Sequence, residues 1–353
     1  MMKNLLLETE EQAEKALRRC MDRVPFLTIE SLRREAIVEG FRADIIATIA
    51  LPDQKKTLVV EVKNNGQPRV ARAAVNQLLR YRESYQDAYG VFIAPYIASE
   101  AAEICKKDGI GYIDFAGNCR LSFGQVYIEQ SGNSNPNRVK RDLRSLYSPK
   151  ASRILRVLLY DPKKKWKTQD LAKEAEVSLG QIANIKKLLD DREWISTTSY
   201  GFSLSEPEKL LNEWSEKYTY QKNIIREFYT LKSLTDIEAN LSRLCQDKGI
   251  KYALTGFSGA ARIAPNVRYQ RAMAYVTEKT EEVVQQLNLK EVPSGANVLL
   301  LSPYDEGVFY RAREFDGIRI VSPVQLYLDL KNIKGRGEEA AMAVLEESIK
   351  PLW

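Results

Sequence analysis

Residues 42–63, RADIIATIALPDQKKTLVVEVK, decide the fold of the first part of the chain. They contain two runs rich in β-branched residues, Ile45–Leu51 and Thr57–Val62, with polar turn formers between them. Such runs favour strands, so the stretch predicts two neighbouring strands joined by a turn. Because side chains alternate between the faces of a strand, Glu61 and Lys63 share one face.

Two carboxylates and a lysine are predicted to meet at the end of these strands. Asp44 lies on the first strand and can be brought beside Glu61 and Lys63. Carboxylate oxygens are hard ligands suited to Mg²⁺, and a lysine beside them can orient or help to deprotonate an attacking water. The alternative is that a Glu-x-Lys ending an apolar strand only solvates a sheet edge. The first interpretation predicts hydrolysis assisted by Mg²⁺ or Mn²⁺.

This arrangement resembles the PD-(D/E)XK nuclease superfamily, which has the restriction-endonuclease-like fold. The resemblance rests on Asp44, Glu61-Val62-Lys63 and, on the next predicted helix, Gln77-x-x-x-Tyr81. Ala43 stands where the superfamily usually has proline. The resemblance implies an α/β/α nuclease domain whose metal site comprises Asp44, Glu61 and Val62. It implies as catalytic residues Asp44, Glu61, Lys63 and Gln77.

Three further residues keep a structural alternative. Gln77 either supports the metal site or is an ordinary glutamine on a helix surface. Superfamily members often carry an additional acid on the first helix, where Glu11 and Glu14 are available. Both glutamates are also compatible with a solvated helix face.

The composition limits the chemistry that the chain can perform. Its 353 residues predict two or three domains, and 44% apolar with 28% charged residues is typical of globular proteins. The net charge of +6 permits a nucleic-acid partner without requiring one. There is no histidine, and the four cysteines form no Cys-x-x-Cys pair. Histidine-based catalysis and Cys/His zinc sites are therefore excluded, which leaves carboxylates, lysine and a metal for hydrolysis.

The sequence favours a cytoplasmic location. The first residues, MMKNLLLETEEQAEK, turn acidic after three leucines, which is not typical of a signal peptide. No run approaches the roughly 18 apolar residues of a membrane span.

Strands and helices alternate along the first 130 residues, which indicates an α/β sheet covered by helices. The expected elements are a helix at 8–22, a strand at 26–37, the two strands described above, a helix at 69–86, a strand at 89–95, a helix at 97–107, a strand at 111–114 and two short strands ending near 130. Asp114 and Asn118 form either a second polar site or a tight turn.

Residues 130–142 indicate a linker, since Ser, Asn, Gly and Pro gather there with basic residues. The cations either contact phosphates or only keep the connector solvated. They are Arg138, Lys140, Arg141 and Arg144.

Residues 149–205 predict three helices and a hairpin, with the third helix starting near Ser178. Ser178-Leu179-Gly180-Gln181 fits a capping box. The order of elements resembles the winged helix-turn-helix domains of bacterial regulators, whose third helix enters the major groove. The resemblance implies DNA contacts from Ser178, Gln181, Asn184, Lys186, Lys187, Lys164 and Lys165. A structural winged helix that binds protein is the alternative.

The last part of the chain resembles the nucleotidyltransferase-like domain of abortive-infection antitoxins. Residues 250–261 predict a strand, a turn of small residues and a helix, and the segments 322–330 and 336–341 match the tail of that family. Transferases of this fold hold metal with an Asp-x-Asp pair on the following strand. Residues 271–276 contain no acid, so we expect binding or scaffolding rather than nucleotide transfer.

The sequence thus predicts an α/β multi-domain chain. Its parts are a restriction-endonuclease-like domain (1–135), a winged helix (145–205), a helical connector (206–247) and a non-catalytic α+β nucleotidyltransferase-like domain (248–353). Two functions stay open: a Mg²⁺-dependent DNA endonuclease, and a non-catalytic transcriptional regulator or antitoxin of a type IV toxin-antitoxin system. Double-stranded DNA is the expected partner, with a nucleotidyltransferase-type toxin under the second hypothesis. No membrane partner is expected, and a homodimer is left open.

Overall fold

The computed structural model describes residues 2–38, 41–85, 87–134, 146–263, 269–277 and 279–353. The chain divides into two compact units, residues 1–143 with 189–193, and residues 144–188 with 194–353. Most of the predicted linker, including Arg138, Lys140 and Arg141, lies outside the described residues, and so does Arg144. None of the helices described is both long and apolar enough to cross a membrane.

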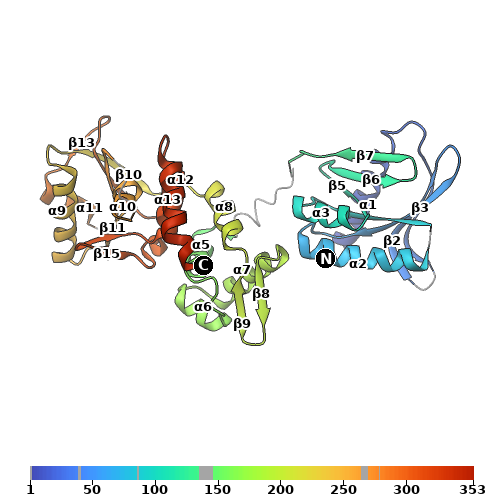
Figure 1. Ribbon diagram of the computed structural model, residues 1–353, viewed down its shortest axis with the longest axis horizontal. Coiled ribbons are helices and arrows are strands. Elements are labelled where there is room, and N and C mark those ends of the chain that lie inside the picture. Colours follow the sequence, from blue (N-terminus) through green and yellow to red (C-terminus); the bar gives the residue numbers. More distant parts are fainter. Residues whose placement is uncertain (1, 39–40, 86, 135–145, 264–268, 278) are drawn as a thin grey trace. The chain divides into compact units, whose positions relative to one another are not determined.

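The first unit is built on a seven-stranded mixed sheet in which the strands follow in chain order (Figure 1). Strands β1 to β3 pair antiparallel, β3 to β5 pair parallel, and β5 to β7 pair antiparallel. The elements are α1 (Met2–Met21), β1 (Thr28–Val38), β2 (Phe41–Ala50), β3 (Lys55–Val62), α2 (Pro68–Ser84), β4 (Ala88–Ala94), α3 (Ser99–Lys107), β5 (Gly111–Asp114), β6 (Cys119–Phe123) and β7 (Val126–Gln130).

Helices cover both faces of this sheet and create two apolar cores. One core joins Ala13 and Leu17 of α1 to Ile45 and Val60 of the sheet. The other joins α2 and α3, which lie side by side in Figure 1, to the opposite face of the sheet. Alternation along β2 and β3 divides their side chains between the two cores. The result is a three-layer α/β/α unit, as the sequence predicts.

The second unit begins with three helices and a two-stranded hairpin (Figure 1). These are α5 (Pro149–Tyr160), α6 (Thr168–Glu174), α7 (Leu179–Asp191), β8 (Ile195–Thr198) and β9 (Gly201–Leu204). The last three residues of α7 are grouped with the first unit. Trp166 and Phe202 exchange two backbone hydrogen bonds, of 2.7 and 3.0 Å, which tie the segment before α6 to the hairpin. Gly201 permits this approach, because a Cβ there would lie 2.5 Å from the Trp166 carbonyl oxygen.

The rest of the second unit surrounds another seven-stranded mixed sheet, in the order β13-β10-β14-β12-β11-β16-β15. Its elements are α8 (Pro207–Lys217), η1 (Tyr220–Lys222), β10 (Ile224–Tyr229), α9 (Leu234–Asp247), β11 (Tyr252–Leu254), α10 (Gly256–Ile263), β12 (Ala272–Val276), α11 (Thr280–Leu287), β13 (Lys290–Glu291), β14 (Val298–Ser302), η2 (Glu306–Phe309), β15 (Arg313–Phe315), β16 (Ile318–Ile320), α12 (Pro323–Lys331), α13 (Gly337–Val344), η3 (Leu345–Ile349) and η4 (Lys350–Leu352).

The helical connector predicted for residues 206–247 is wrong between Ile224 and Tyr229. These six residues form β10, which pairs antiparallel with β14 in the sheet. The segment has the β-branched and aromatic side chains that favour strands, and Phe228 is fully buried in the core of the sheet. Residues 206–247 therefore belong to the fold of the last part of the chain.

Candidate functional site

Asp44, Glu61 and Lys63 meet where β2 and β3 run side by side. The antiparallel register pairs Ile45 with Val60, so the next position sets Asp44 opposite Glu61. The Val62 N–H donates to Asp44 Oδ2 over 2.7 Å, and Lys63 Nζ pairs with Glu61 Oε1. The structure thus brings together three side chains that the sequence singles out.

The Glu61 carboxylate is almost completely buried yet incompletely satisfied. Its side chain is 2% exposed, whereas that of Lys63 is 32% exposed. Lys63 engages one carboxylate oxygen, and the other, Oε2, has no hydrogen-bond partner among the residues described. Burial raises the pKa of Glu61 above its usual value, the hydrogen bond from Lys63 lowers it, and the charge of Asp44 raises it. An oxygen in this state favours a positively charged ligand.

The donor set at this position fits a hard divalent cation. Asp44 and Glu61 supply carboxylate oxygens, and Glu61 Oε2 has unused acceptor capacity. Within the described ranges, no group of three or more His, Cys, Asp or Glu side chains could hold a metal ion. A cation bound here would therefore have these two carboxylates as its side-chain ligands. The role of Val62 as a ligand stays a prediction, since the observed contact is from its N–H group.

Glu10 on α1 is an acid near this site that the sequence patterns did not single out. It is buried, and its pKa is raised first by burial and next by the charge of Asp44. Glu10 stands three and seven residues before the buried Ala13 and Leu17, so it lies on the apolar stripe of its helix. A carboxylate on an apolar stripe is the signal that could have identified it.

Glu11 and Glu14, which the sequence offered as the additional acid of the first helix, form ion pairs instead. Glu11 is exposed and pairs with Lys15 at 2.7 Å. Glu14 pairs with Arg18 of its own helix at 2.9 Å and with Arg34 of β1 at 2.6 Å. Both belong to the surface of α1, which is the alternative that the sequence left open.

Gln77 contacts Tyr81 rather than the carboxylates. Its Nε2 donates to the Tyr81 hydroxyl over 2.6 Å, and that hydroxyl donates to the Arg42 carbonyl over 2.7 Å. Arg42 precedes Asp44 by two residues on β2. Gln77 and Tyr81 thus fix the strand that carries Asp44, and a direct catalytic role for Gln77 stays a prediction.

Asp114 and Asn118 form a turn. The Asp114 carboxylate accepts from the backbone and side-chain N–H groups of Asn118 at 2.9 and 2.8 Å, and from the Ile97 N–H at 3.3 Å. Asp114 is fully buried. These hydrogen bonds occupy the carboxylate oxygens of Asp114 and stabilise the turn that follows β5.

The predicted capping box is present at the start of α7. The Ser178 N–H donates to Gln181 Oε1 over 3.1 Å, and the Gln181 N–H donates to Ser178 Oγ over 3.3 Å. This pair satisfies amides that the first turn of a helix leaves free. The side-chain oxygen of Gln181 is therefore committed to the helix itself.

The predicted lysines lie around α7 and the hairpin. Lys164 Nζ is 3.8 Å from the centre of the Trp166 ring, and Lys186 Nζ is 5.0 Å from that of Phe202. Lys165 and Lys187 are exposed. Among the described residues none of these four lysines forms a salt bridge, so their charges are available to an anionic partner.

A buried polar network lies in the last part of the chain. Asp329 is fully buried, and burial raises its pKa, while four hydrogen bonds favour the carboxylate. The donors are Thr255, Tyr218, Gln325 and Tyr275. Gln325 in turn accepts a hydrogen bond of 3.1 Å from Arg156 of α5. These groups satisfy one another in the interior, so the network is structural.

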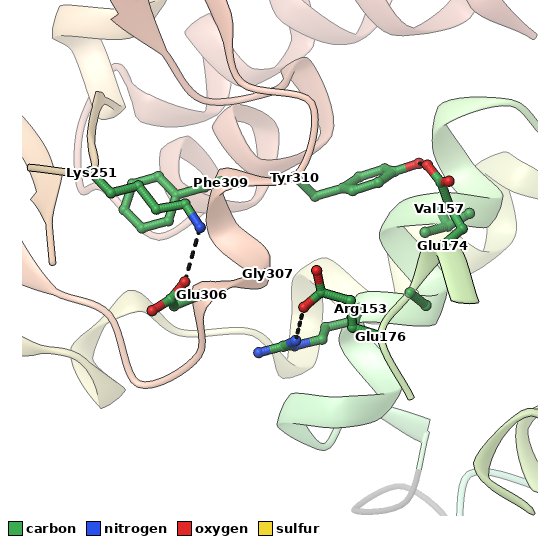
Figure 2. Close-up of a pocket in the computed structure, with 10 residues that line it drawn as sticks. Arg153, Val157, Glu174, Glu176, Lys251, Glu306, Gly307, Phe309 and Tyr310 are labelled. Atoms are coloured by element: carbon green, nitrogen blue, oxygen red, sulfur yellow. Dashed lines mark hydrogen bonds and ion pairs between the residues drawn. The ribbon is translucent and has the colours of Figure 1, made fainter. Parts of the chain in front are cut away.

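A cavity of ≈ 130 Å³ lies between α5, α6 and η2 (Figure 2). Charged and polar side chains line it, and several of them are paired with one another (Figure 2). The pairs are Lys251 with Glu306 (2.9 Å), Arg153 with Glu176 (3.0 Å) and Tyr310 with Glu174 (2.8 Å). Because these groups are already engaged with one another, the cavity is a weaker candidate site than the Asp44–Glu61 pair.

Residues 203–350 match the family described as "Transcriptional regulator, AbiEi antitoxin, Type IV TA system". The match confirms the resemblance of the last part of the chain to antitoxin regulators, and it begins after the three helices and most of the hairpin. No curated protein matches the chain.

Three solved structures are similar over a short part of the chain. An EndoMS complex with double-stranded DNA is 20% identical with a TM-score of 0.21, and the match covers 29% of this chain and 43% of that one. A repair endonuclease from Pyrococcus abyssi is 19% identical with a TM-score of 0.22, covering 29% and 46%. EndoMS in its apo form is 21% identical with a TM-score of 0.22, covering 29% and 45%. The chain therefore spans less than half of the length of each.

Proposed function

We propose that the protein binds double-stranded DNA and cleaves its phosphodiester bonds with the help of Mg²⁺ or Mn²⁺. The observation that carries the proposal is the buried Glu61 carboxylate, which has one unpartnered oxygen among the described residues and lies beside Asp44 and Lys63. A structural carboxylate at such a position would normally have all its oxygens hydrogen-bonded.

Each residue of this site would have a separate role in the reaction. Asp44 and Glu61 would hold the cation, which when bound supplies Lewis-acid activation of water and stabilises phosphate charge. Lys63 pairs with Glu61, so its ammonium group is a donor that can orient the water or the scissile phosphate. Hydrolysis would join the water oxygen to phosphorus and break the bond to the leaving sugar oxygen. The water would release one proton to solvent, and the leaving oxygen would take up a proton from solvent. The Gln77–Tyr81 pair would keep β2 in position.

Plasmid cleavage tests this proposal. We expect the wild-type protein to convert supercoiled plasmid to nicked or linear forms in Mg²⁺ or Mn²⁺. Asp44→Asn and Lys63→Met should reduce the rate by at least about 100-fold, the scale at which acid–base groups act. Glu11→Gln is the matched control, because Glu11 is an exposed acid paired with Lys15, and it should cleave like wild type. Equal activity, or equal inactivity, of all four proteins would contradict the proposal.

We further propose that residues 149–205 form a winged helix that binds duplex DNA, with α7 in the major groove. The segment holds eleven Lys and Arg residues against seven Asp and Glu, so its excess of four positive charges is most of the chain's +6. Lys164, Lys165, Lys186 and Lys187 would contact phosphates, which orient a protein on DNA without reading its sequence.

A substitution at Gly180 can test the proposed DNA-binding surface of α7 without disturbing the fold. A Cβ built at Gly180 meets no atom within 4 Å, so a larger side chain there should be tolerated. Gly180→Glu adds negative charge to α7 and should weaken duplex binding by at least about tenfold, whereas the exposed Gln286→Glu on α11 should not. If the two variants bind alike, the DNA surface lies elsewhere.

The salt dependence of binding tests the lysines of α7 directly. Replacing Lys186 and Lys187 by Ala should lower the slope of log affinity against log salt concentration by about one unit for each phosphate that is no longer neutralised. A slope equal to that of wild type would place the phosphate contacts on other residues.

The second candidate function is a non-catalytic regulator or antitoxin. The family match over residues 203–350 favours it. Under this hypothesis the last domain is nucleotidyltransferase-like without transferase activity, since β12 carries no acid and Asp329 is enclosed by structural hydrogen bonds. Neutralisation of a co-expressed nucleotidyltransferase-type toxin that persists in Asp44→Asn would support this function. Lack of any effect on such a toxin would argue against it.

A further inference from the structure

The outward face of α7 has an unusual composition for a surface helix. Its exposed residues are Leu179, Gly180, Ala183, Asn184 and Lys187. They recur at the three- and four-residue spacing of one helical stripe, while the opposite stripe, with Ile182, Ile185 and Leu189, is buried. Leu179 is 51% exposed at the start of the helix. The face therefore has small side chains near its centre and an exposed apolar side chain at its start.

Asn184 is the amide on this face that remains available for recognition. Gln181, the other amide near it, is half-buried and its oxygen accepts from the Ser178 N–H in the capping box. Lys186 lies over the Phe202 ring. Lys187 is on the face but stands one turn beyond Asn184, and recognition helices contact bases mainly through their first residues. The groups that this face can present to a base pair are thus the carboxamide of Asn184 and the methyl groups of Ala183 and Leu179.

Asparagine and apolar side chains have defined partners in the major groove. A carboxamide can bond both N7 and the N6 amino group of adenine, and an alkyl group can contact the 5-methyl group of thymine. Guanine is usually bound by Arg or Lys, and the first turns of this face contain neither. Because Gly180 has no side chain, the helix can approach the base edges closely.

We propose that α7 selects A·T base pairs, with Asn184 binding adenine and with Ala183 and Leu179 contacting thymine methyl groups. This inference rests on the proposed binding of duplex DNA and specifies its target. Leu179 and Asn184 are five residues apart, about 7.5 Å along the helix axis at 1.5 Å per residue. That length matches about two base-pair steps of 3.4 Å. The recognised element is therefore a run of two or three adjacent A·T pairs.

The test is selection from random duplex DNA with full-length protein carrying Asp44→Asn, which preserves the DNA during the assay. We expect enriched sites to contain adjacent A·T pairs. Asn184→Ala should reduce the preference at one position by about 5- to 150-fold, while Lys187→Ala should weaken binding to all sequences equally. Both variants should keep the thermal unfolding curve of the parent protein.

Deoxyuridine provides an independent measurement, because it lacks the thymine methyl group. Replacing thymine by deoxyuridine in the selected site should weaken binding by about fourfold, as expected for one buried methyl group, and Leu179→Ser with Ala183→Gly should abolish that difference. Duplex binding without A·T preference, or a preference unchanged in Asn184→Ala, overturns this inference and leaves DNA binding standing. No duplex binding at all overturns both.

Discussion

Replacing Glu61 by glutamine should stabilise the first unit while removing its cation site. The carboxylate is 2% exposed and one of its oxygens has no partner among the described residues. A glutamine keeps an acceptor for Lys63 and replaces a buried charge by a neutral group. An unsatisfied buried polar group costs about 1–3 kcal/mol, so we expect Glu61→Gln to gain about 1–2 kcal/mol, or roughly 3–8 °C in Tm for a unit of this size.

The four tryptophans make this measurement specific to one unit. They are Trp166, Trp194, Trp214 and Trp353, and all lie in the second unit. Tryptophan fluorescence therefore follows that unit alone, whereas far-UV circular dichroism follows both. The Tm gain of Glu61→Gln should appear in circular dichroism and calorimetry and leave the fluorescence transition unchanged. The exposed Glu11→Gln should change stability by less than about 0.5 kcal/mol.

The stability that Glu61→Gln adds to the first unit should also depend on pH, and it should be larger at high pH. The folded pKa of Glu61 is raised, so the buried charge destabilises the wild type fully above that pKa. As pH falls through the folded pKa toward the unfolded value of about 4.3, the carboxyl gains a proton and the cost disappears. The advantage of Glu61→Gln should therefore be larger at pH 8 than near pH 4.5. A destabilised Glu61→Gln at pH 8, or a gain that grows as pH falls, would refute the reasoning.

Three further substitutions test other parts of the fold. Asp329→Ala removes the acceptor of four buried donors and should lower the unfolding free energy of the second unit by about 3–5 kcal/mol, measured as a lower urea midpoint of tryptophan fluorescence. Gln181→Ala breaks the capping box and should cost about 0.5–2 kcal/mol in the same assay, so an unchanged midpoint would show that the box contributes nothing. Gly201→Ala would place a Cβ 2.5 Å from the Trp166 carbonyl oxygen at a φ of +143°, so it should cost at least about 1 kcal/mol and shift the fluorescence spectrum. A wild-type spectrum and midpoint would contradict that account.

The sequence correctly predicts those elements that are determined by residues close together in the chain. The two β-branched runs around Pro52 form β2 and β3, and their antiparallel register brings Asp44 opposite Glu61. The capping box at Ser178 forms because all its atoms lie within one helical turn. In both cases the spacing along the chain nearly determines the geometry.

Other features depend on contacts that spacing does not encode. β10 is a strand because β14 lies beside it, although Ile224 follows the helix α8 closely in the chain. The hydrogen-bond donors to Asp329 come from four separate parts of the chain, so no local sequence pattern predicts this network. They are Gln325 of α12, Tyr275 of β12, Tyr218 after α8 and Thr255 before α10. Glu10 is predictable in principle from the stripe it shares with Leu17, but only the fold brings that stripe near Asp44.

Binding of Mn²⁺ to the full-length protein, followed by the electron paramagnetic resonance signal of the free ion, tests the central claim most directly. We predict that wild type and Glu11→Gln take up Mn²⁺ with the same affinity, and that Asp44→Asn and Glu61→Gln each lose this binding. Mn²⁺ binding by Asp44→Asn equal to that of wild type would contradict the account.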